Sequence, residues 1–333
     1  MKAMRFDRYG IPTEVLQLRD VDVPLVENDG VLVRVHAASL NPADWHLVNG
    51  VPHVSRPQIG LRSPKVSGLG VDLAGEVVEV GPAVTSVRPG DEVYGCVDPL
   101  PGTNVPALGS VAEYVRVTEG ATRPKPTVLD WQQAAAIPLA ATTALHGLRD
   151  IAGVQPGQRV LINGASGGVG TLAIQVARAL GAAVTAVCST RNIELVRSLG
   201  AGQVIDYTRE DPTRVAQDLH VVLDNVGNHP ASAWRRTLSR DGTYVASFGR
   251  KEARHIGPMG RIAGMLALGS VSSQRFAILP TTWEAERLDM ISELIGSGQI
   301  RPVVDRTFQL AAAAEGLSYL GEGHARGKVI VVI

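Results

Sequence analysis

The sequence predicts an α/β protein with a β-barrel-like domain and a doubly wound parallel sheet. Two observations lead to this fold class. Short strand-like segments separated by turns fill the chain up to about residue 125, whereas helical and strand-like segments alternate from about residue 130. The length of 333 residues fits about two domains, each large enough to bury its own core.

The first part of the chain carries strand patterns with partial alternation of apolar residues. They lie at 31–35, 75–80 and 112–117. A turn at 88–91 separates two of them, where Pro89 fixes φ and the glycine after it supplies a positive φ. A run of short strands of this kind is typical of a compact β-barrel-like domain.

The second part alternates helices with strands. Asp130 is positioned to N-cap a helix over 131–136. Regular alternation predicts parallel βαβ units with helices on both faces of the sheet. After about residue 301 we expect a strand, an Ala-rich helix and a final strand over 328–333. The strand-like runs of the second part lie at 159–163, 183–187, 204–207, 221–224 and 243–247.

Composition and charge exclude several classes of protein. The chain has 32 Lys+Arg and 32 Asp+Glu, and this balance argues against a dedicated nucleic-acid binder, which would need a basic face. Residues 1–8 are charged without the apolar core of a signal peptide, and no apolar run approaches the roughly 18 residues of a membrane span. We therefore expect a cytoplasmic protein with no membrane partner. Two cysteines are too few for a disulfide framework or a four-thiolate zinc site.

The most informative segment is a glycine-rich turn between a strand and a helix at 160–180. Apolar residues recur at helical spacing after the turn, and Gly181 is positioned to stop the helix. The turn reads A-x-G-x-x-G, and in this context it predicts a dinucleotide site in which helix N–H groups bind the pyrophosphate. The predicted cofactor-binding residues of the turn are Ala165, Ser166, Gly167, Gly168, Val169 and Gly170.

The end of the next strand indicates which dinucleotide is bound. An NAD site would place a carboxylate there, about 20 residues after the glycines. This chain has Ser189, Thr190 and Arg191 instead, and hydroxyls with a guanidinium suit the 2′-phosphate of NADPH. The alternative is that Arg191 is only a solvated residue at a helix start. Cys188 before them is interpreted as a small buried strand residue.

Five motifs carry family information, at 38–46, 70–77, 80–95, 164–170 and 324–328. Together they resemble the medium-chain dehydrogenase/reductase superfamily, in its zinc-independent quinone oxidoreductase-like branch. The resemblance implies a GroES-like catalytic domain formed by 1–127 and 300–333, around a Rossmann NADP-binding domain at 128–299. It also implies a homodimer formed through the edge of the Rossmann sheet.

The resemblance also bears on metal and reaction. Zinc-dependent members have Cys at the position of Asn41, Gly-His-Glu at 70–72 and a third ligand near Pro138, so no metal ligand is predicted here. The relatives reduce quinones or α,β-unsaturated carbonyl compounds with NADPH, which implies a small-molecule substrate. Two alternatives remain open: an alcohol or carbonyl dehydrogenase, and a non-catalytic NADPH-binding protein such as a sensor or a crystallin-like protein.

Site residues are carried over from the family position by position. Asn41, Asp44 and His46 are implied near the nicotinamide, with Thr142 beside the cofactor. His46 is a candidate proton donor, and a role as a pocket wall is the alternative. For Tyr207 the alternative is that it only covers a strand end, and for Arg326 that it lies on the surface. The remaining implied cofactor residues are Tyr207, Asn225, Val226, Ser247, Phe248, Gly249 and Arg326.

Overall fold

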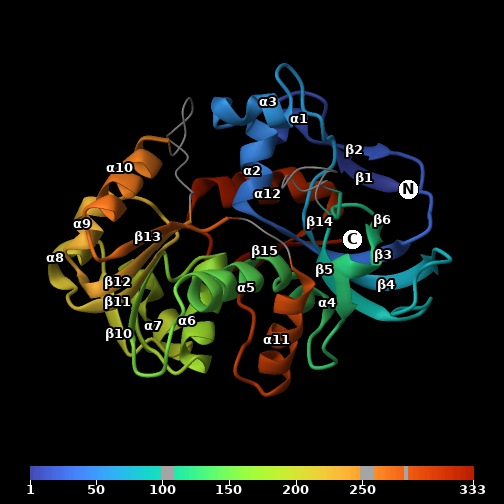
Figure 1. Cartoon of the computed structure of the whole chain (residues 1–333). Helices are drawn as coiled ribbons and strands as arrows, with labels where there is room; N and C mark the ends of the chain where they lie inside the picture. The colour runs from blue at the N-terminus through green and yellow to red at the C-terminus, as the bar shows by residue number, and fades with distance from the viewer. Residues whose placement is uncertain (99–108, 248–258, 281–283) are drawn as a thin grey trace. The chain divides into compact units, whose positions relative to one another are not determined.

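The computed structural model describes residues 1–98, 109–247, 259–280 and 284–333 (Figure 1). The chain divides into two compact units. Unit 1 comprises Met1–Thr142, Thr282–Ser297 and Pro302–Ile333, and unit 2 comprises Thr143–Thr281 and Gly298–Arg301. The domain boundaries given above, at 127/128 and 299/300, stay predictions.

Unit 1 is built on a seven-stranded sheet in the order β14-β15-β3-β4-β5-β7, with β6 also paired to β3. The last strand of the chain runs antiparallel to β3, with Val331 opposite Ala38, so sequence-distant segments share this sheet. A hairpin of β1 and β2 lies outside it. The strands are β1 (Lys2–Arg5), β2 (Gln17–Asp20), β3 (Gly30–Leu40), β4 (Asp72–Val80), β5 (Glu92–Cys96), β6 (Tyr114–Thr118), β7 (Thr122–Pro124), β14 (Val304–Gln309) and β15 (Lys328–Val332).

The strands of unit 1 form where apolar side chains alternate. Val31, Val33 and Val35 of β3 are at most 2% exposed and face one core, as the pattern at 31–35 predicted. Gly90 has a φ of +94°, so the predicted turn is present. The helices are α1 (Pro12–Val15), α2 (Pro42–Asn49), α3 (Arg56–Ile59), α4 (Trp131–Ala135), α5 (Pro138–Leu145), α11 (Ala285–Gly296) and α12 (Ala313–Glu322), with 3₁₀ turns at His53–Ser55, Glu119–Ala121 and Leu310–Ala312.

Unit 2 contains six parallel strands in the order β10-β9-β8-β11-β12-β13, which confirms the predicted doubly wound sheet. Leu161, Trp234 and Tyr244 are fully buried in its core. The strands are β8 (Arg159–Asn163), β9 (Ala183–Cys188), β10 (Gln203–Asp206), β11 (Leu219–Asp224), β12 (Leu238–Ala246) and β13 (Arg275–Ile278). The helices are α6 (Gly168–Ala179), α7 (Ile193–Ser198), α8 (Pro212–Val215), α9 (Ala231–Arg235) and α10 (Met259–Ser270), with a π-helix at His146–Ile151 and a 3₁₀ turn at Thr190–Asn192.

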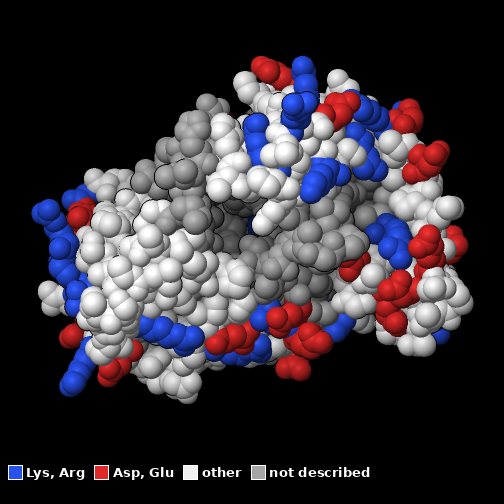
Figure 2. Space-filling model, turned by 45° about the horizontal axis from the view of Figure 1, so that its top comes forward, with Lys and Arg blue, Asp and Glu red and all other residues white. Residues whose placement is uncertain are grey.

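The surface carries charges of both signs. Figure 2 shows lysines and arginines together with aspartates and glutamates around the outline of the molecule, as the balanced composition suggested. Within the described part of the chain, no helix is both long and apolar enough to cross a membrane.

The sequence did not predict the edge strand β13, because its four residues show no clear alternation of apolar and polar side chains.

Candidate functional site

The glycine-rich turn connects β8 to α6 at the carboxyl ends of the parallel strands of unit 2. Gly164 has a φ of +76°, which favours glycine, and Gly167 is the N-cap of α6. A Cβ on Gly170 would lie 2.2 Å from the carbonyl oxygen of Gly164, so only glycine allows the helix to approach the turn this closely. The turn therefore has the shape that the sequence pattern predicts.

The turn is open where a phosphate would bind. A Cβ on Gly167 would meet only the Gly164 oxygen, at 3.5 Å. The backbone N–H groups of Gly168, Val169 and Gly170 begin α6 and have no intrahelical acceptor, and the helix dipole favours an anion beside them. Ala165 is fully buried, and its N–H donates to Val187 at 3.1 Å, so it fixes the turn on β9.

Polar side chains at the ends of β9 and β10 lie beside this turn. The Asn192 amide donates to Ser166 Oγ at 2.9 Å and to Ser189 Oγ at 3.2 Å, which ties the turn to the end of β9. Thr190 Oγ1 donates to Asp206 Oδ2 at 2.5 Å, and this bond lowers the pKa of the aspartate. The sequence did not predict a role for Asp206, because the pattern that distinguishes NAD from NADPH concerns only the end of β9.

The other predicted cofactor residues of unit 2 are partly exposed, or they lie outside the described residues. Arg191 is exposed at the start of its 3₁₀ turn, and Tyr207 is 51% exposed directly after β10. The Ser247 N–H donates to the Asp224 carbonyl at 2.9 Å, which joins the end of β12 to β11. Phe248 and Gly249 lie outside the described residues.

The end of β11 presents an amide that lacks partners. Both polar side-chain atoms of Asn225 are buried and have no hydrogen bond to any described residue. Val226, which follows it, is 36% exposed. A buried amide without partners costs free energy unless a ligand satisfies it. Together with the open phosphate cradle, this amide fits a bound dinucleotide.

A second polar cluster is buried in unit 1 around the Asp72 carboxylate. Asp72 is 0% exposed and begins β4. Its Oδ2 accepts hydrogen bonds from Ser39 Oγ at 2.5 Å and from Lys328 Nζ at 3.0 Å. Its Oδ1 accepts from the Leu139 N–H at 2.7 Å and from the Cys96 thiol at 3.4 Å. The buried charge is thus compensated by a cation and several donors.

Asn41 belongs to the same cluster. Its Nδ2 donates to Asp72 Oδ2 at 2.9 Å, and its Oδ1 accepts from Lys328 Nζ at 2.6 Å. Asp44, three residues on, accepts the N–H groups of Asn41 at 2.7 Å and Gly70 at 3.1 Å. The structure therefore brings Asn41 and Asp44 together, with Asp44 in a capping box at the start of α2. Burial raises the pKa of the Asp44 carboxyl to about 7.

Comparison with known proteins places both units in one family. Residues 27–127 match the alcohol dehydrogenase GroES-like domain and residues 199–331 match the zinc-binding dehydrogenase model. The chain is 34% identical to the mouse mitochondrial NAD(P)H oxidoreductase RTN4IP1, with 99% of this chain and 89% of that protein covered. The chain belongs to the medium-chain dehydrogenase/reductase superfamily. Its similarities place it in the quinone oxidoreductase-like branch.

Two further similarities support this branch. The chloroplastic NADPH-dependent alkenal/one oxidoreductase of Arabidopsis thaliana is 35% identical, over 99% of this chain and 79% of that protein. The quinone oxidoreductase structure from Coxiella burnetii has a TM-score of 0.85 and 32% identity, over 100% of this chain and 99% of that chain. The fold class predicted from the sequence, a GroES-like domain with a Rossmann sheet, is confirmed.

One of the two family models is named for zinc binding, but the side chains of this chain do not suit a zinc ion. Among the residues that the structure describes, no group of three or more His, Cys, Asp or Glu side chains could hold a metal ion. The Lys328 ammonium already bonds to both Asn41 and Asp72, and a cation there repels a second one. Burial raises the pKa of the Cys96 thiol well above its usual range, which disfavours a thiolate ligand.

The family resemblance implies three further site residues in unit 1, which lie on different elements. His46 is half-buried on α2, and its ring lies edge-on to Trp45 with centroids 5.4 Å apart. The Thr142 hydroxyl is buried and donates to the Pro138 carbonyl at 2.6 Å, within α5. Arg326 is exposed, and its backbone N–H donates to Asp305 at 3.0 Å.

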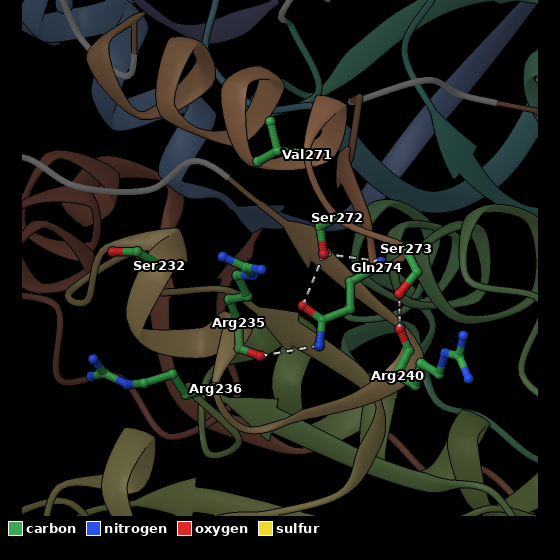
Figure 3. A pocket seen from close by; sticks show the side chains of 8 residues that line it. All are labelled: Ser232, Arg235, Arg236, Arg240, Val271, Ser272, Ser273 and Gln274. Carbon is green, nitrogen blue, oxygen red and sulfur yellow. Dashed lines mark hydrogen bonds between the residues drawn. The ribbon is translucent and has the colours of Figure 1, made fainter.

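A separate hollow of about 710 Å³ lies at the amino ends of the unit 2 strands, the edge of the sheet opposite to the glycine-rich turn (Figure 3). Gln274 fixes its floor, because its Nε2 donates to the carbonyls of Arg235 at 3.2 Å and Ser239 at 2.9 Å. Arg240 lies at the start of β12, whereas the glycine-rich turn follows the end of β8. In a parallel sheet these are opposite edges, so the hollow is not the dinucleotide site.

Proposed function

We propose that this protein is an NADPH-dependent oxidoreductase that reduces quinones or the activated C=C bonds of α,β-unsaturated carbonyl compounds. The glycine-rich turn at the start of α6, open to a phosphate, is the observation that carries this proposal. Members of its family with similar sequence or fold are named for these reactions, as alkenal/one oxidoreductase and quinone oxidoreductase.

The chain's own groups account for binding. The N–H groups at the start of α6 bind the pyrophosphate, and the Asn225 amide faces the dinucleotide. Ser189, Thr190 and Arg191 bind the 2′-phosphate, and Arg191 provides the positive charge. When NADPH is bound, it supplies a hydride. The neighbouring Asp206 carboxylate accepts hydrogen bonds from Thr190 at 2.5 Å and from Thr208 at 2.7 Å.

The substrate class follows from the donors that the site contains. The side chains of Asn41 and Asp72 bind each other and Lys328, which makes them unsuited to hold a Lewis acid that would polarise a plain ketone. A substrate that already carries an activated double bond requires no such polarisation, since its developing enolate needs only hydrogen-bond donors. We therefore propose metal-free reduction.

His46 is the proposed proton donor after hydride transfer. An imidazole can give up a proton near neutral pH, and no other histidine lies on α2. In a His46→Phe variant, kcat is expected to fall about 10²-fold or more and to change its pH profile. An unchanged rate and pH profile would leave water as the donor and His46 as a wall of the pocket.

A spectrophotometric screen tests the function. Oxidation of NADPH and NADH is followed at 340 nm with quinones, enones, enoyl thioesters and aldehydes, with and without EDTA. We expect turnover with quinones or enones, preference for NADPH, and full activity after chelation. Turnover of aldehydes only, or activity lost with EDTA and restored by zinc, would favour an alcohol dehydrogenase. Binding without any turnover would favour a non-catalytic protein.

Arg191 tests the choice of cofactor. Arg191→Ala is expected to raise the KM for NADPH about tenfold or more, because a charge-assisted bond to the phosphate is lost, and to leave the KM for NADH within about twofold. Arg209→Ala, a nearby arginine two residues beyond Tyr207, serves as the control. Equal effects of Arg191→Ala on both cofactors would refute the assignment of the 2′-phosphate.

We also propose that the protein is a homodimer joined through β13. No described strand pairs with the outer edge of β13. The Leu279 N–H donates inward to Ala246 at 2.9 Å, and backbone groups alternate along a parallel strand, so Ile278 directs its N–H outward. Sedimentation should show a dimer for the wild type and for Ile278→Ala, and a monomer for Ile278→Pro. A dimeric Ile278→Pro variant would contradict this interface.

A cytoplasmic location stays a prediction.

A further inference from the structure

A guanidinium from α10 closes the turn that follows β11. Arg261 Nη1 donates to the Gly227 carbonyl at 2.5 Å, and its Nη2 donates to the Tyr244 hydroxyl at 3.0 Å. The same Nη2 lies 3.4 Å from Asp224 Oδ2 and 3.3 Å from the His229 carbonyl. One planar side chain therefore bridges a carboxylate, a phenol and two backbone carbonyls, which a single ammonium could not do.

The turn itself is wound around the Asp224 carboxylate. Asp224 is 0% exposed, and its Oδ1 accepts the N–H groups of Val226 at 3.0 Å and Gly227 at 2.8 Å. Oδ1 also accepts from the Asn163 amide at 2.9 Å, and Oδ2 accepts from Tyr244 at 2.7 Å. Because Asn163 ends β8 directly before the glycine-rich turn, this one carboxylate links two strand ends at the dinucleotide edge.

The fit between the turn and the guanidinium depends on a glycine. Gly227 has a φ of +72°, and a Cβ there would lie 1.8 Å from Arg261 Nη1. Any larger residue at 227 would displace the guanidinium from the carbonyl that it binds. Asn225, whose buried amide has no partner among the described residues, lies inside this turn.

We propose that Arg261 is a positioning residue of the cofactor site. Its guanidinium holds residues 224–227 in the shape that presents the Asn225 amide to the dinucleotide, and it acts only through that turn. The inference rests on the proposed NADPH dependence and deepens it. It assigns to α10 a role in cofactor affinity, although Arg261 itself does not touch the cofactor.

The test compares NADPH affinity among matched variants by quenching of protein fluorescence. Arg261→Met is expected to raise the Kd for NADPH about tenfold or more, the effect typical of losing hydrogen bonds to a charged group. Arg261→Lys keeps the charge and should give a smaller rise. Arg235→Met is the control, because Arg235 lines the hollow at the other edge of the sheet (Figure 3) and should change the Kd by less than about twofold.

A merely structural role is separated from positioning by two further measurements. In steady-state kinetics the KM for NADPH should rise in Arg261→Lys, while kcat at saturating NADPH and the KM for the quinone stay within about twofold. In a double-mutant cycle with Asn225→Ala, the double variant should bind NADPH no more weakly than Asn225→Ala alone, because Arg261 acts through that amide.

The outcomes separate this inference from the proposed function. If the wild type binds NADPH but reduces no substrate, the proposed function fails, and the binding comparison still decides the role of Arg261. If Arg261→Met and Arg261→Lys bind NADPH as the wild type does, or if their effects add fully to Asn225→Ala, the positioning role is refuted. If the wild type binds no nicotinamide dinucleotide, both proposals fail. Where Arg261→Met does not fold, Arg261→Lys decides.

Discussion

Removing the Lys328 ammonium provides a direct test of the buried cluster in unit 1. Lys328→Met keeps the aliphatic length of the side chain but removes the cation. Asp72 would then remain as a carboxylate with 0% exposure, with Ser39, Asn41, Cys96 and the Leu139 N–H as its donors. Breaking a buried ion pair by removing one partner costs about 3–5 kcal/mol, because the other charge stays buried without compensation.

This free energy converts into a measurable shift of the melting temperature. Unit 1 has about 190 residues, and in a domain of that size 1 kcal/mol corresponds to about 2–4 °C. Lys328→Met should therefore lower Tm by about 6–20 °C in differential scanning calorimetry. Lys328→Arg is expected to lose less, because it keeps the positive charge.

An exposed ion pair serves as the control. Lys2 Nζ lies 2.7 Å from Asp20, closer than Lys328 to Asp72, but the two side chains are 49% and 75% exposed. Lys2→Met should therefore cost less than about 1 kcal/mol. If Lys328→Met and Lys2→Met lower Tm equally, burial does not govern the strength of the pair. Adding Asp72→Asn to Lys328→Met should recover part of the loss, since it removes the uncompensated charge.

Three other expectations follow from the geometry. Gly170→Ala should lower both Tm and NADPH affinity, because its Cβ meets backbone at 2.2 Å, whereas Gly167→Ala should weaken binding with Tm unchanged, since its Cβ meets nothing nearer than 3.5 Å. Equal Tm values for the two variants would contradict this. The folded pKa of Asp44, about 7, lies above its unfolded value, so the contribution of Asp44 to stability should fall between about pH 4 and 7 by up to about 1.4 kcal/mol per pH unit. In urea titrations the stability of the wild type should therefore fall relative to that of Asp44→Asn over this range, and parallel pH dependences of the two proteins would oppose it. Cys96 and Cys188 are buried with raised pKa values, so a thiol reagent should label neither until the protein unfolds, and rapid labelling of the native protein would refute this.

Local patterns explain why the strand, turn and helix around the glycines could be predicted from the sequence. The strand, the glycines and the helix at 160–180 are contiguous, and the two glycines with a conformational or steric requirement, Gly164 and Gly170, meet it within the turn itself. The same holds for Asp130, whose capping box with Gln133 is present. The parallel sheet followed from the alternation of elements, which is also a local signal.

The polar partners of the site could not be predicted, because topology rather than spacing brings them together. Lys328 and Asp72 are 256 residues apart in the chain, and Arg261 and Asp224 are 37 residues apart. Two weak signals were present. A lysine opens an otherwise apolar final strand, and the Asn41-x-x-Asp44 spacing is that of a capping box. The second signal indicates that Asp44 stabilises the start of α2, while its implied place near the nicotinamide stays a prediction.

Both units use the same physical device at the end of a buried strand. Asp72 at the start of β4 and Asp224 at the end of β11 are each fully buried and each is paired with a cation from a sequence-distant segment. The Asp72 carboxylate accepts the backbone N–H of Leu139, and the Asp224 carboxylate accepts those of Val226 and Gly227. A buried carboxylate is costly unless nearly all of its lone pairs are satisfied, so each aspartate fixes the backbone that surrounds it. In unit 2 that backbone carries the Asn225 amide. In unit 1 the carboxylate also holds the side chain of Asn41, the N-cap of α2, and His46 lies in the last turn of that helix. Substitutions of the two cations should therefore affect different properties. Substitution of Arg261 should weaken cofactor binding, and substitution of Lys328 should destabilise the segment that carries the proposed proton donor.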